Sequence, residues 1–321
     1  MAPSRILLTG ASGCIGHYLA EALIAQTNCE LLLLVRDPAK LQLDCQARPG
    51  IRVLQGDLRE IERWGPTLAT VEVAILAATA WGGEAAFEIN VTQTLRLLAL
   101  LDPAVCQQVF YFSTASLLDY HHRLLPAAAR WGTEYIRSKY ACHQRLSESP
   151  WADHITVLFP TLVFGGDARK PRSYLTTGVA DAAPWVALAR WLRVEGSFHF
   201  IHARDIAQIV CQLLAQPPAA PGPRELVLGA PAVTANEAIA TFCRYLGKRI
   251  YLRLPLPGWL IRLLVAVLPV QLSPWDRFCL RRRHFSHRNP TDPSHFGLRP
   301  YCPTLFEALR LSGVPTQAPG R

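Results

Sequence analysis

Tyr135 and Lys139 stand four residues apart in the segment TEYIRSK. On a helix this spacing places both side chains on one face, where they can reach a shared ligand. A free tyrosine has a pKa of about 10 and is a poor acid or base at neutral pH. A nearby ammonium group stabilises the phenolate and lowers that pKa. The pair therefore predicts a tyrosine that exchanges a proton with a substrate oxygen.

Hydroxyl side chains follow the strand that we expect before this helix. The apolar run QVFYF leads directly into Ser113, Thr114, Ala115 and Ser116. A hydroxyl at this point could hydrogen-bond a substrate carbonyl beside Tyr135. The Tyr-x-x-x-Lys pattern alone occurs by chance in many helices, so its position after a hydroxyl-rich strand end is what favours catalysis.

A glycine-rich turn near the start of the chain is a candidate phosphate site. TGASGCIG, residues 9–16, lies between the strand-like run RILLT and the helical pattern CIGHYLAEALIAQ. Gly10 permits a tight turn, Gly13 lets the backbone approach a diphosphate, and Gly16 lets helix and strand pack closely. The N–H groups and partial positive charge of the helix N-terminus would face the phosphates. The spacing is GxxGxxG rather than GxGxxG, and a simple turn is the alternative.

Charged residues at the ends of the next strands bear on the choice of dinucleotide. Arg36 lies roughly 20 residues after Gly16, where an acidic residue would bond the ribose 2′-hydroxyl of NAD. An arginine there suits the 2′-phosphate of NADP, although Asp37 follows directly. Asp57 ends the third strand in GDL, where it either bonds the adenine amino group or serves a turn. We expect NADP, with NAD as the alternative.

The order of the apolar patterns predicts the fold. Strand-like runs near residues 5–9, 30–36, 51–57, 71–79, 108–112 and 155–165 alternate with helical patterns. This alternation predicts an α/β fold, a doubly wound Rossmann parallel sheet with helices on both faces. Residues 1–165 are expected to form the dinucleotide-binding domain, with residues 197–229 returning to its sheet. Residues 166–196 and 230–321 are expected to form a smaller C-terminal substrate lobe. Within it we expect a loop at 167–178 and a helix that Gly247 ends.

Composition narrows the class of partner. Half of the 321 residues are hydrophobic, and the formal net charge is +9. This charge suits a phosphate-bearing ligand or an anionic surface, but the arginines are not interleaved with aromatics as nucleic-acid binding would require. The nine cysteines form neither a CxxC pair nor a cluster at metal-ligand spacing. They predict reduced thiols, a cytoplasmic location and no metal site.

One segment raises the question of membrane contact. WLIRLLVAVLPV, residues 259–270, is followed by the basic segment RRRHFSHR, residues 281–288. The apolar run is shorter than the roughly 18 residues of a membrane span, and no signal peptide is recognisable. A short apolar helix near basic residues can lie on an anionic bilayer. The alternative is a helix of the C-terminal lobe that packs over the substrate pocket.

Eight segments in the same order resemble the extended or atypical short-chain dehydrogenase/reductases of the NAD-dependent epimerase/dehydratase family. They are TGASGCIG, GDL, LAAT, INVTQT, FSTAS, the Tyr135–Lys139 pattern, FPTLVFGGD and FIHARDIA. Two departures weigh against a sugar-nucleotide substrate. Leu117, Leu118 and Asp119 replace the family's usual V-Y-G, and Phe159 replaces its usual arginine.

The resemblance implies roles for the matching residues. Thr114 would bind the substrate oxygen, with Ser116 as the fallback. Tyr135 would be the acid/base, and Lys139 would bond the nicotinamide ribose and tune Tyr135. Cofactor contacts are implied for Gly10, Ser12, Gly13, Cys14, Ile15, Gly16, Arg36, Asp57, Leu58, Ala77, Ala78, Asn90, Lys139, Pro160 and Val163.

Together these features predict an NADP-dependent oxidoreductase that transfers hydride between the nicotinamide and a carbonyl or hydroxyl carbon. One alternative is a sugar-nucleotide epimerase or dehydratase with tightly bound NAD. Another is a non-catalytic NADP(H)-binding scaffold or sensor. The expected partner is a small-molecule substrate, and the resemblance suggests a homodimer.

Four residues outside these motifs have roles that the sequence leaves open or assigns to structure. Trp81 follows the fourth strand and either faces the substrate or packs in its loop. His199 and His202 are expected to be structural or at the pocket edge, and Asp205 to be a helix cap or ion-pair residue.

Overall fold

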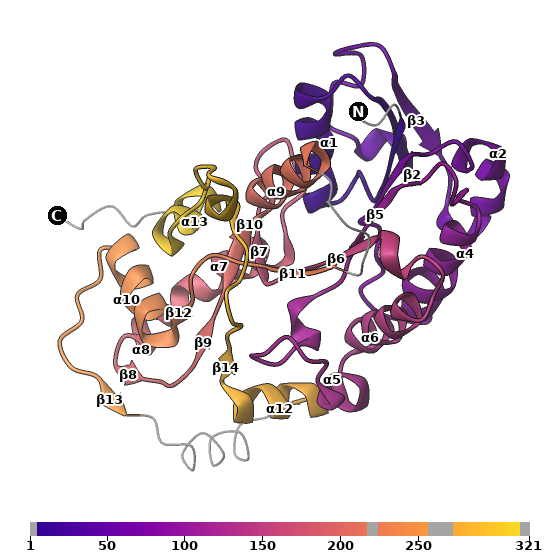
Figure 1. Cartoon of the computed structure of the whole chain (residues 1–321). Helices are drawn as coiled ribbons and strands as arrows, with labels where there is room; N and C mark the ends of the chain where they lie inside the picture. The colour runs from indigo at the N-terminus through magenta and orange to yellow at the C-terminus, as the bar shows by residue number, and fades with distance from the viewer. Residues whose placement is uncertain (1–4, 217–223, 256–271, 315–321) are drawn as a thin grey trace.

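The structure is a computed structural model that describes residues 5–216, 224–255 and 272–314. A seven-stranded parallel sheet forms the centre of its larger unit, with strand order β3-β2-β1-β4-β5-β6-β11 (Figure 1). The strands are β1 (Arg5–Thr9), β2 (Glu30–Val35), β3 (Ile51–Gln55), β4 (Val73–Leu76), β5 (Gln108–Phe112), β6 (Ile155–Pro160) and β11 (Arg224–Leu228). This confirms the predicted doubly wound sheet.

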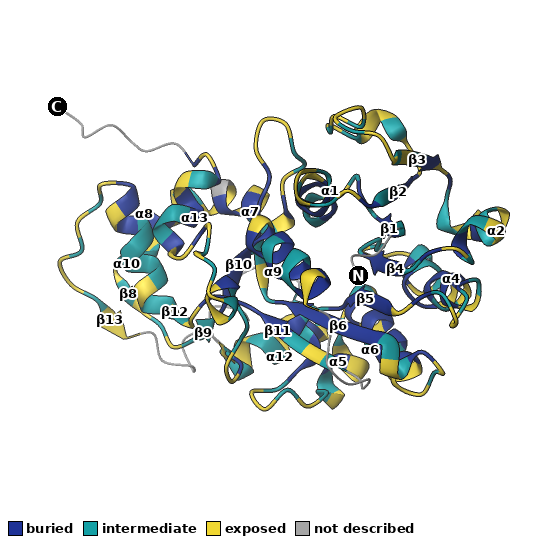
Figure 2. Cartoon of the chain, turned by 45° about the horizontal axis from the view of Figure 1, so that its top comes forward, coloured by how far each residue is buried: buried dark blue, intermediate teal, exposed yellow. Residues whose placement is uncertain are grey.

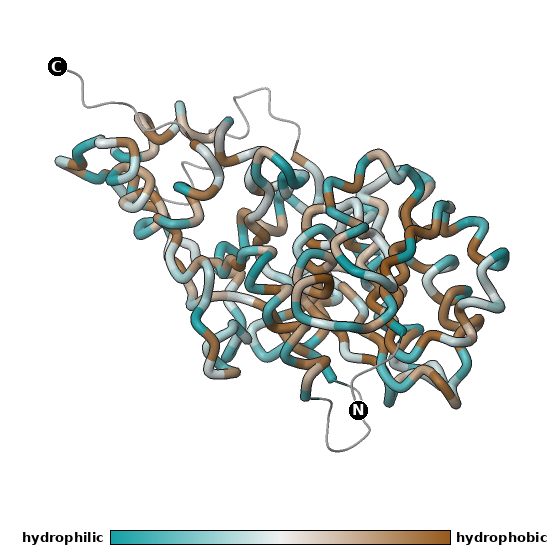
Figure 3. The backbone as a smooth tube through the Cα atoms, turned by 90° about the horizontal axis from the view of Figure 1, so that it is seen from above, coloured by the Kyte–Doolittle hydropathy of each residue, from teal (hydrophilic) through white to brown (hydrophobic). Residues whose placement is uncertain are grey.

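Helices cover both faces of this sheet because successive strand residues point to opposite sides. Leu8 of β1 packs toward α1 (Cys14–Gln26) and α9 (Ala203–Ala215), which lie side by side. Leu7 packs toward α4 (Thr94–Ala99) and α6 (Glu134–Ser147). Figure 2 shows the central strands buried between these layers, and Figure 3 shows hydrophobic segments gathered inside the larger unit.

The helical segment between β4 and β5 is a composite. It consists of α3 (Ala85–Phe87), a π-helical segment η3 (Glu88–Gln93) and α4. Shorter elements complete the larger unit: η1 (Pro38–Lys40), η2 (Leu58–Trp64), α2 (Gly65–Leu68), η4 (Ala115–Leu117), α5 (Pro126–Trp131) and η5 (Ala152–His154). A π segment inside a helix often marks a functional site, and η3 contains Asn90.

Two predicted elements differ in the structure. The strand expected over 155–165 is divided at Thr161, whose N–H and hydroxyl both donate to the Leu228 carbonyl. Past this point β7 (Leu162–Phe164) leaves the main sheet and pairs with β10 (Phe200–His202). The loop expected at 167–178 contains the start of α7 (Tyr174–Ala182), where the Ser173 hydroxyl accepts from the Thr176 N–H.

The smaller lobe is assembled from the C-terminal part of the chain and an excursion before β10. Its elements are η6 (Ala183–Trp185), α8 (Val186–Ala189), β8 (Leu192–Arg193), β9 (Ser197–Phe198), β12 (Val233–Thr234), α10 (Ala235–Tyr245), β13 (Leu254–Pro255), α12 (Pro274–Arg282), β14 (His284–Phe285), η7 (Pro293–Phe296) and α13 (Leu305–Leu311). Gly247 follows α10 with φ +66°, in agreement with the expected helix stop.

The return of residues 197–229 to the main sheet is correct only in part. β11 joins the sheet beside β6, but β9 pairs with β12 and β14 in the lobe. β10 pairs with β7, which has itself left the main sheet, so the segment before α9 does not reach that sheet. The division into two domains stays a prediction.

Two further expectations concern segments and side chains rather than the sheet. The segment 259–270 lies outside the described residues. In the parts that are described, no helix has the length and apolar character needed to cross a bilayer. All nine cysteines are free thiols.

Candidate active site

The glycine turn connects β1 to α1 at the carboxyl end of the sheet. Gly10 has φ +71°, and a Cβ there would lie 2.6 Å from the Ala78 nitrogen. A Cβ on Gly16 would lie 2.0 Å from the Gly10 carbonyl oxygen, so helix and turn touch directly. Gly13 is the N-cap of α1, and among the described residues no side chain caps this helix. The turn therefore presents bare backbone, as a diphosphate site requires.

The loop after β4 forms the second wall of this cradle. Ala77 and Ala78 lie against Gly10, and the Ala78 N–H donates to the Thr9 hydroxyl at 3.2 Å. β1 and β4 are neighbours in the sheet although β2 and β3 separate them in sequence. A ligand in a doubly wound fold binds at such a reversal of strand order.

Thr114 and Tyr135 meet at the end of β5. The two side chains share a hydrogen bond, which lowers the pKa of Tyr135, but burial has the larger effect and raises that pKa to about 12. Thr114 also accepts from the Ser116 N–H at 3.3 Å, which fixes its hydroxyl. Ser116 makes this backbone contact, and Thr114 is the hydroxyl side chain that contacts Tyr135. That Thr114 binds the substrate oxygen stays a prediction.

Lys139 is buried one helical turn from Tyr135 and has a specific orientation. Its Nζ donates to the Phe112 carbonyl at 2.7 Å and lies 4.8 Å from the centre of the Tyr111 ring. Burial lowers the pKa of Lys139 to about 8. Burial has the largest effect on the pKa of Tyr135 in this structure, and the lowering of that pKa by Lys139 stays a prediction.

Asn90 hydrogen-bonds the loop after β4 to α6 and does not line an open groove. It is fully buried, and its Oδ1 accepts from the Ala80 N–H at 2.8 Å and from the Thr79 hydroxyl at 3.0 Å. Its Nδ2 donates to the Ala80 carbonyl at 2.8 Å and the Ser138 hydroxyl at 2.9 Å. The expected groove-lining role is corrected, because these bonds engage its polar atoms in joining the loop after β4 to α6.

An exposed aromatic stack covers the acid/base candidate. The ring of Trp81 stacks on the ring of Tyr135 with centroids 4.6 Å apart. It also stacks on the ring of Tyr174, with centroids 6.1 Å apart. Trp81 is 63% and Tyr174 85% exposed. Trp81 is thus an exposed ring beside Tyr135, and that it faces the substrate stays a prediction. Tyr174 was missed because its segment lacks a clear helical pattern.

The backbone of the Trp81 loop is tied to the catalytic helix. Glu134 directly precedes Tyr135, and its Oε2 accepts from the Gly83 N–H at 2.5 Å. The only sequence signal for this contact is the position of Glu134 beside Tyr135.

Arg36 and Asp57 face each other at the ends of β2 and β3. The Arg36 side chain is 78% exposed, and its Nη1 lies 4.0 Å from Asp57 Oδ2. Asp57 Oδ1 accepts from the Arg59 N–H at 2.9 Å, so this aspartate caps η2, the simpler of its two expected roles. Asp37 accepts from the Ala39 N–H at 3.0 Å and is directed into its own turn. Arg36 is therefore the side chain of this pair that remains available to a phosphate.

The remaining cofactor candidates surround the cradle in different degrees of burial. Ser12, Cys14 and Ile15 are half-buried at the start of α1, Leu58 is half-buried at the start of η2, Pro160 is buried at the end of β6, and Val163 is half-buried in β7. Burial raises the pKa of the Cys14 thiol to about 12. That thiol is therefore a packing group rather than a nucleophile.

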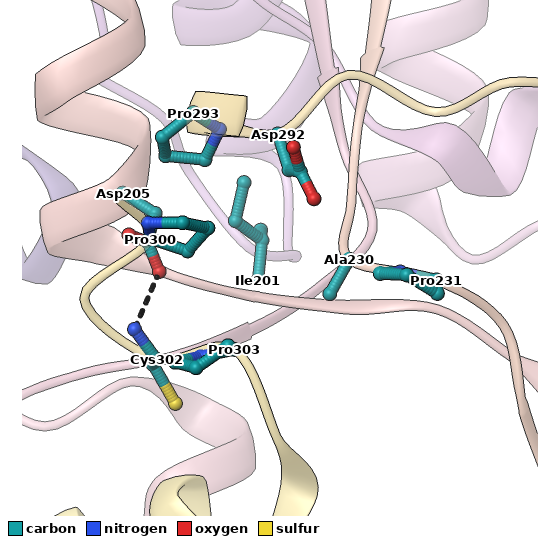
Figure 4. Close-up of a pocket in the computed structure, with 9 residues that line it drawn as sticks. All are labelled: Ile201, Asp205, Ala230, Pro231, Asp292, Pro293, Pro300, Cys302 and Pro303. Atoms are coloured by element: carbon teal, nitrogen blue, oxygen red, sulfur yellow. Dashed lines mark hydrogen bonds between the residues drawn. The ribbon is translucent and has the colours of Figure 1, made fainter. Parts of the chain in front are cut away.

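A cavity of about 150 Å³ lies elsewhere, below α9 (Figure 4). Its walls include Asp205, whose carboxylate accepts from the Tyr301 and Cys302 N–H groups at 2.6 and 3.2 Å. His202 caps α9 through the Arg204 N–H, and His199 bonds the Ala230 carbonyl. The two histidines are structural, as expected. Asp205 neither caps α9 nor forms an ion pair among the described residues, so its expected role is wrong: it binds the backbone of the segment at Tyr301 and Cys302 instead. Thr114, Tyr135 and Lys139 do not line this cavity.

A comparison with models of known protein families identifies the family of this chain. The model of the NAD dependent epimerase/dehydratase family matches residues 6–229, more than two thirds of the chain. The chain belongs to this family. It is thus an NAD(P)-dependent enzyme of the epimerase/dehydratase family, and the scaffold alternative has no support from the match. No curated protein sequence matches it at a significant level.

Solved structures share the fold of this epimerase/dehydratase-family protein over nearly the whole chain. A dTDP-glucose 4,6-dehydratase from Bacillus anthracis in complex with NAD has a TM-score of 0.64 and 13% identity, covering 97% of this chain and 96% of its own. A UDP-glucose 4-epimerase from Stenotrophomonas maltophila with NAD and formylated UDP-arabinopyranose has a TM-score of 0.63 and 19% identity, covering 96% of each chain. At these identities the likeness establishes the fold.

Proposed function

We propose that this family member transfers hydride at a carbon that carries a hydroxyl or carbonyl group, with Tyr135 exchanging the proton of that oxygen. The observation that carries the proposal is the hydrogen bond between Thr114 and Tyr135 beside a buried Lys139. Two hydroxyls that converge on one point can bind one substrate oxygen. Their place at the carboxyl end of β5, next to the glycine cradle, is where such an oxygen would meet a dinucleotide.

The residues present fit a nicotinamide dinucleotide. The bare turn at Gly10, Gly13 and Gly16 would hold its diphosphate, and a Cβ at Gly10 or Gly16 would collide with backbone. Lys139 would donate to a ribose hydroxyl. The bound nicotinamide ring supplies the hydride acceptor or donor, which none of the protein side chains can provide.

The chain's own residues control the proton and the substrate orientation. With its pKa raised to about 12, Tyr135 is protonated at neutral pH and can donate a proton directly to a carbonyl oxygen. To accept the proton of a substrate hydroxyl, it would first have to lose its own. The Thr114 hydroxyl orients that oxygen. Trp81 and Tyr174 supply flat apolar surface beside it and exclude water from one side.

The comparisons favour a sugar-nucleotide epimerase or dehydratase over the NADP-dependent oxidoreductase. The family match and the neighbours that act on dTDP- and UDP-sugars support this reading. In it, the cofactor is NAD, stays bound and returns to its starting state.

One observation favours the oxidoreductase as a second candidate. Arg36 is exposed at the ribose end of the cradle, while Asp37 is directed into η1. A guanidinium in this position binds a 2′-phosphate well, because it offers several donors in a rigid plane. The second candidate is therefore an enzyme that uses exchangeable NADP(H) on a small carbonyl compound.

Mass spectrometry of the nucleotide that co-purifies with the protein separates the two candidates. Retained NAD⁺ that resists exchange supports the epimerase or dehydratase. NADPH that exchanges freely supports the oxidoreductase. If no nucleotide is retained and neither NADH nor NADPH binds when added, the proposed function is wrong in both forms.

Replacement of Tyr135 by phenylalanine tests the proton-transfer role. Because general acid–base catalysis contributes about 100-fold or more, we expect kcat to fall by at least that factor in Tyr135→Phe. Dinucleotide binding should persist, because the ring still packs against Trp81. The measurement is single-turnover hydride transfer from bound nucleotide, scored with whichever carbonyl substrate the native protein turns over. Equal rates for both proteins would remove Tyr135 from the mechanism.

A further inference from the structure

The end of the small lobe carries a cluster of exposed large apolar side chains. Figure 1 shows α8, β8 and β13 together at the end of the lobe that faces away from the main sheet. The cluster, called here the lobe-end surface, consists of Trp185, Leu188, Trp191, Tyr251, Leu252 and Leu254, which are 69%, 59%, 39%, 72%, 60% and 58% exposed. Scattered single residues of this kind are normal on protein surfaces, but a group of six is a sign of an interaction site.

Backbone contacts hold the two segments of this surface side by side. Leu254 pairs with Leu192 in the β8–β13 ladder, and the Leu254 N–H donates to the Trp191 carbonyl at 2.8 Å. Arg190 Nη1 donates to the Arg249 carbonyl at 3.2 Å. The segments that carry these exposed side chains are therefore adjacent in the fold although they are distant in sequence.

Positive charge accompanies the apolar side chains. The segments 183–194 and 246–255 contain Arg190, Arg193, Lys248, Arg249 and Arg253 and contain no aspartate or glutamate. The Arg193 and Arg249 side chains are exposed, and the Arg190 guanidinium lies 5.0 Å from the Trp191 ring. The sequence 256–271 continues without an acidic residue. A second protein copy would bring the same positive charge to the contact, whereas an anionic surface would complement it.

We propose that the lobe-end surface docks this protein on the headgroup layer of an anionic lipid bilayer. Tryptophan and tyrosine rings are suited to the interface between headgroups and acyl chains, and exposed leucines enter the outer part of the acyl region. Arginine and lysine side chains bind the anionic headgroups. Thr114 follows β5 and Tyr135 lies in α6, so docking through the end of the lobe leaves the active site outside the contact.

Vesicle flotation of the full-length protein tests the docking. We expect the native chain to float at low salt with vesicles of 70% phosphatidylcholine and 30% phosphatidylglycerol, and to remain unbound with phosphatidylcholine alone. Binding should weaken as salt is raised, since the attraction to the surface is screened. Absence of binding to the anionic vesicles at low salt would overturn the proposal.

Two pairs of variants locate the contact. Arg193→Gln together with Arg249→Gln removes two charges from the surface and should weaken vesicle affinity roughly 30-fold, at about fivefold per basic residue. Arg137→Gln together with Arg145→Gln removes two exposed charges from α6 and should leave affinity nearly unchanged. Equal losses in both double variants would overturn the proposal, because a general charge effect would then explain binding.

The apolar half of the surface has its own matched control. Leu188→Ser and Leu252→Ser should each weaken vesicle affinity about 10-fold, because each removes a leucine from the interface. Leu280→Ser makes the same change at a 42% exposed leucine of α12 and should have little effect. Dinucleotide binding confirms that each variant is folded. If analytical ultracentrifugation instead shows a dimer that Leu188→Ser abolishes, while no variant affects flotation, the surface is an interface between two copies and the membrane proposal is wrong.

Discussion

Arg36 is the single residue with the most influence on which dinucleotide this protein selects. Its side chain is 78% exposed at the end of β2, and its nearest described acidic partner, Asp57, is 4.0 Å away. An exposed pair at this distance contributes little to stability. Redirecting the guanidinium to a ligand phosphate therefore costs the fold almost nothing.

Arg36→Gln should weaken NADPH binding about 10- to 100-fold while leaving NADH binding unchanged, because only NADPH carries the 2′-phosphate. Fluorescence titration with each reduced dinucleotide measures this. Arg52→Gln is the matched control, since Arg52 is also exposed but lies in an ion pair with Glu30 toward the other end of its strand. An equal loss for NADH and NADPH would show that Arg36 does not recognise the 2′-phosphate.

Residue types and spacing allowed the site residues to be predicted where a local motif fixes the geometry. The Gly10–Gly16 turn and the Thr114–Tyr135 contact are such cases. Asn90 was placed in the site, but its orientation was not predictable. The π segment around it turns its amide toward Ala80 and Ser138, and no pattern in the sequence indicates a π segment.

At the scale of elements, the loop after β4 and the helix α6 behave as one support for the catalytic groups. Asn90 joins them through Ala80 and Ser138, and Glu134 joins them again through Gly83. Glu134 precedes Tyr135 in sequence, and Ser138 lies one helical turn after it. Removing either contact should displace the Tyr135 side chain at a smaller disturbance than is needed to unfold the sheet.

Asn90→Ala should lower the free energy of unfolding by about 3 kcal/mol, because it leaves several buried polar groups without partners at about 1–3 kcal/mol each. Urea unfolding followed by circular dichroism measures the loss. Gln93→Ala provides the comparison in the same π segment, since the buried side-chain oxygen of Gln93 has no hydrogen-bond partner. A larger loss for Gln93→Ala than for Asn90→Ala would contradict this account of the support.

Strand and helix patterns predicted the elements of the larger unit well and those of the lobe poorly. β1, β2, β4 and β5 have clear apolar runs that are buried on both faces, which is the strongest signal a parallel sheet offers. The break at Thr161 was missed because apolar residues continue on both sides of Pro160 and Thr161, so the pattern predicts a single strand. Its cause is pairing with β10, some 40 residues further on, which only the tertiary structure supplies.

At the scale of the whole molecule, the C-terminal part of the chain returns to the larger unit and is held there by Asp205. This buried carboxylate near the start of α9 accepts from the Tyr301 and Cys302 N–H groups, and burial raises its pKa to about 6. The folded protein therefore favours the protonated form of Asp205 more than the unfolded chain does. The stability from this group is present below the unfolded pKa of about 3.9 and is lost as pH rises through 6.

Asp205→Asn should therefore change the pH dependence of stability in a defined direction. From pH 4 to pH 7 the free energy of unfolding of the variant should gain about 2 kcal/mol relative to the native chain, which is most of the effect of a shift of about two pKa units. Urea unfolding at several pH values measures the difference. Parallel pH profiles for the two proteins would show that Asp205 has an ordinary pKa.

The most direct test of the central claim, that the glycine turn and the Tyr135 face form one dinucleotide-dependent site, is a titration of NADPH and NADH onto nucleotide-free Gly13→Asp. Gly13 is the N-cap of α1 with extended backbone, so an aspartate there can cap the helix and keep the protein folded. The same carboxylate would repel a diphosphate. Gly65→Asp, at a position with ordinary contacts for a Cβ, controls for the added charge. The account predicts at least a 100-fold loss of dinucleotide affinity in Gly13→Asp with the fold retained. A modest loss of thermal stability is expected, because a Cβ at this position lies 3.3 Å from the Gly10 carbonyl oxygen. Undiminished binding in Gly13→Asp would contradict it.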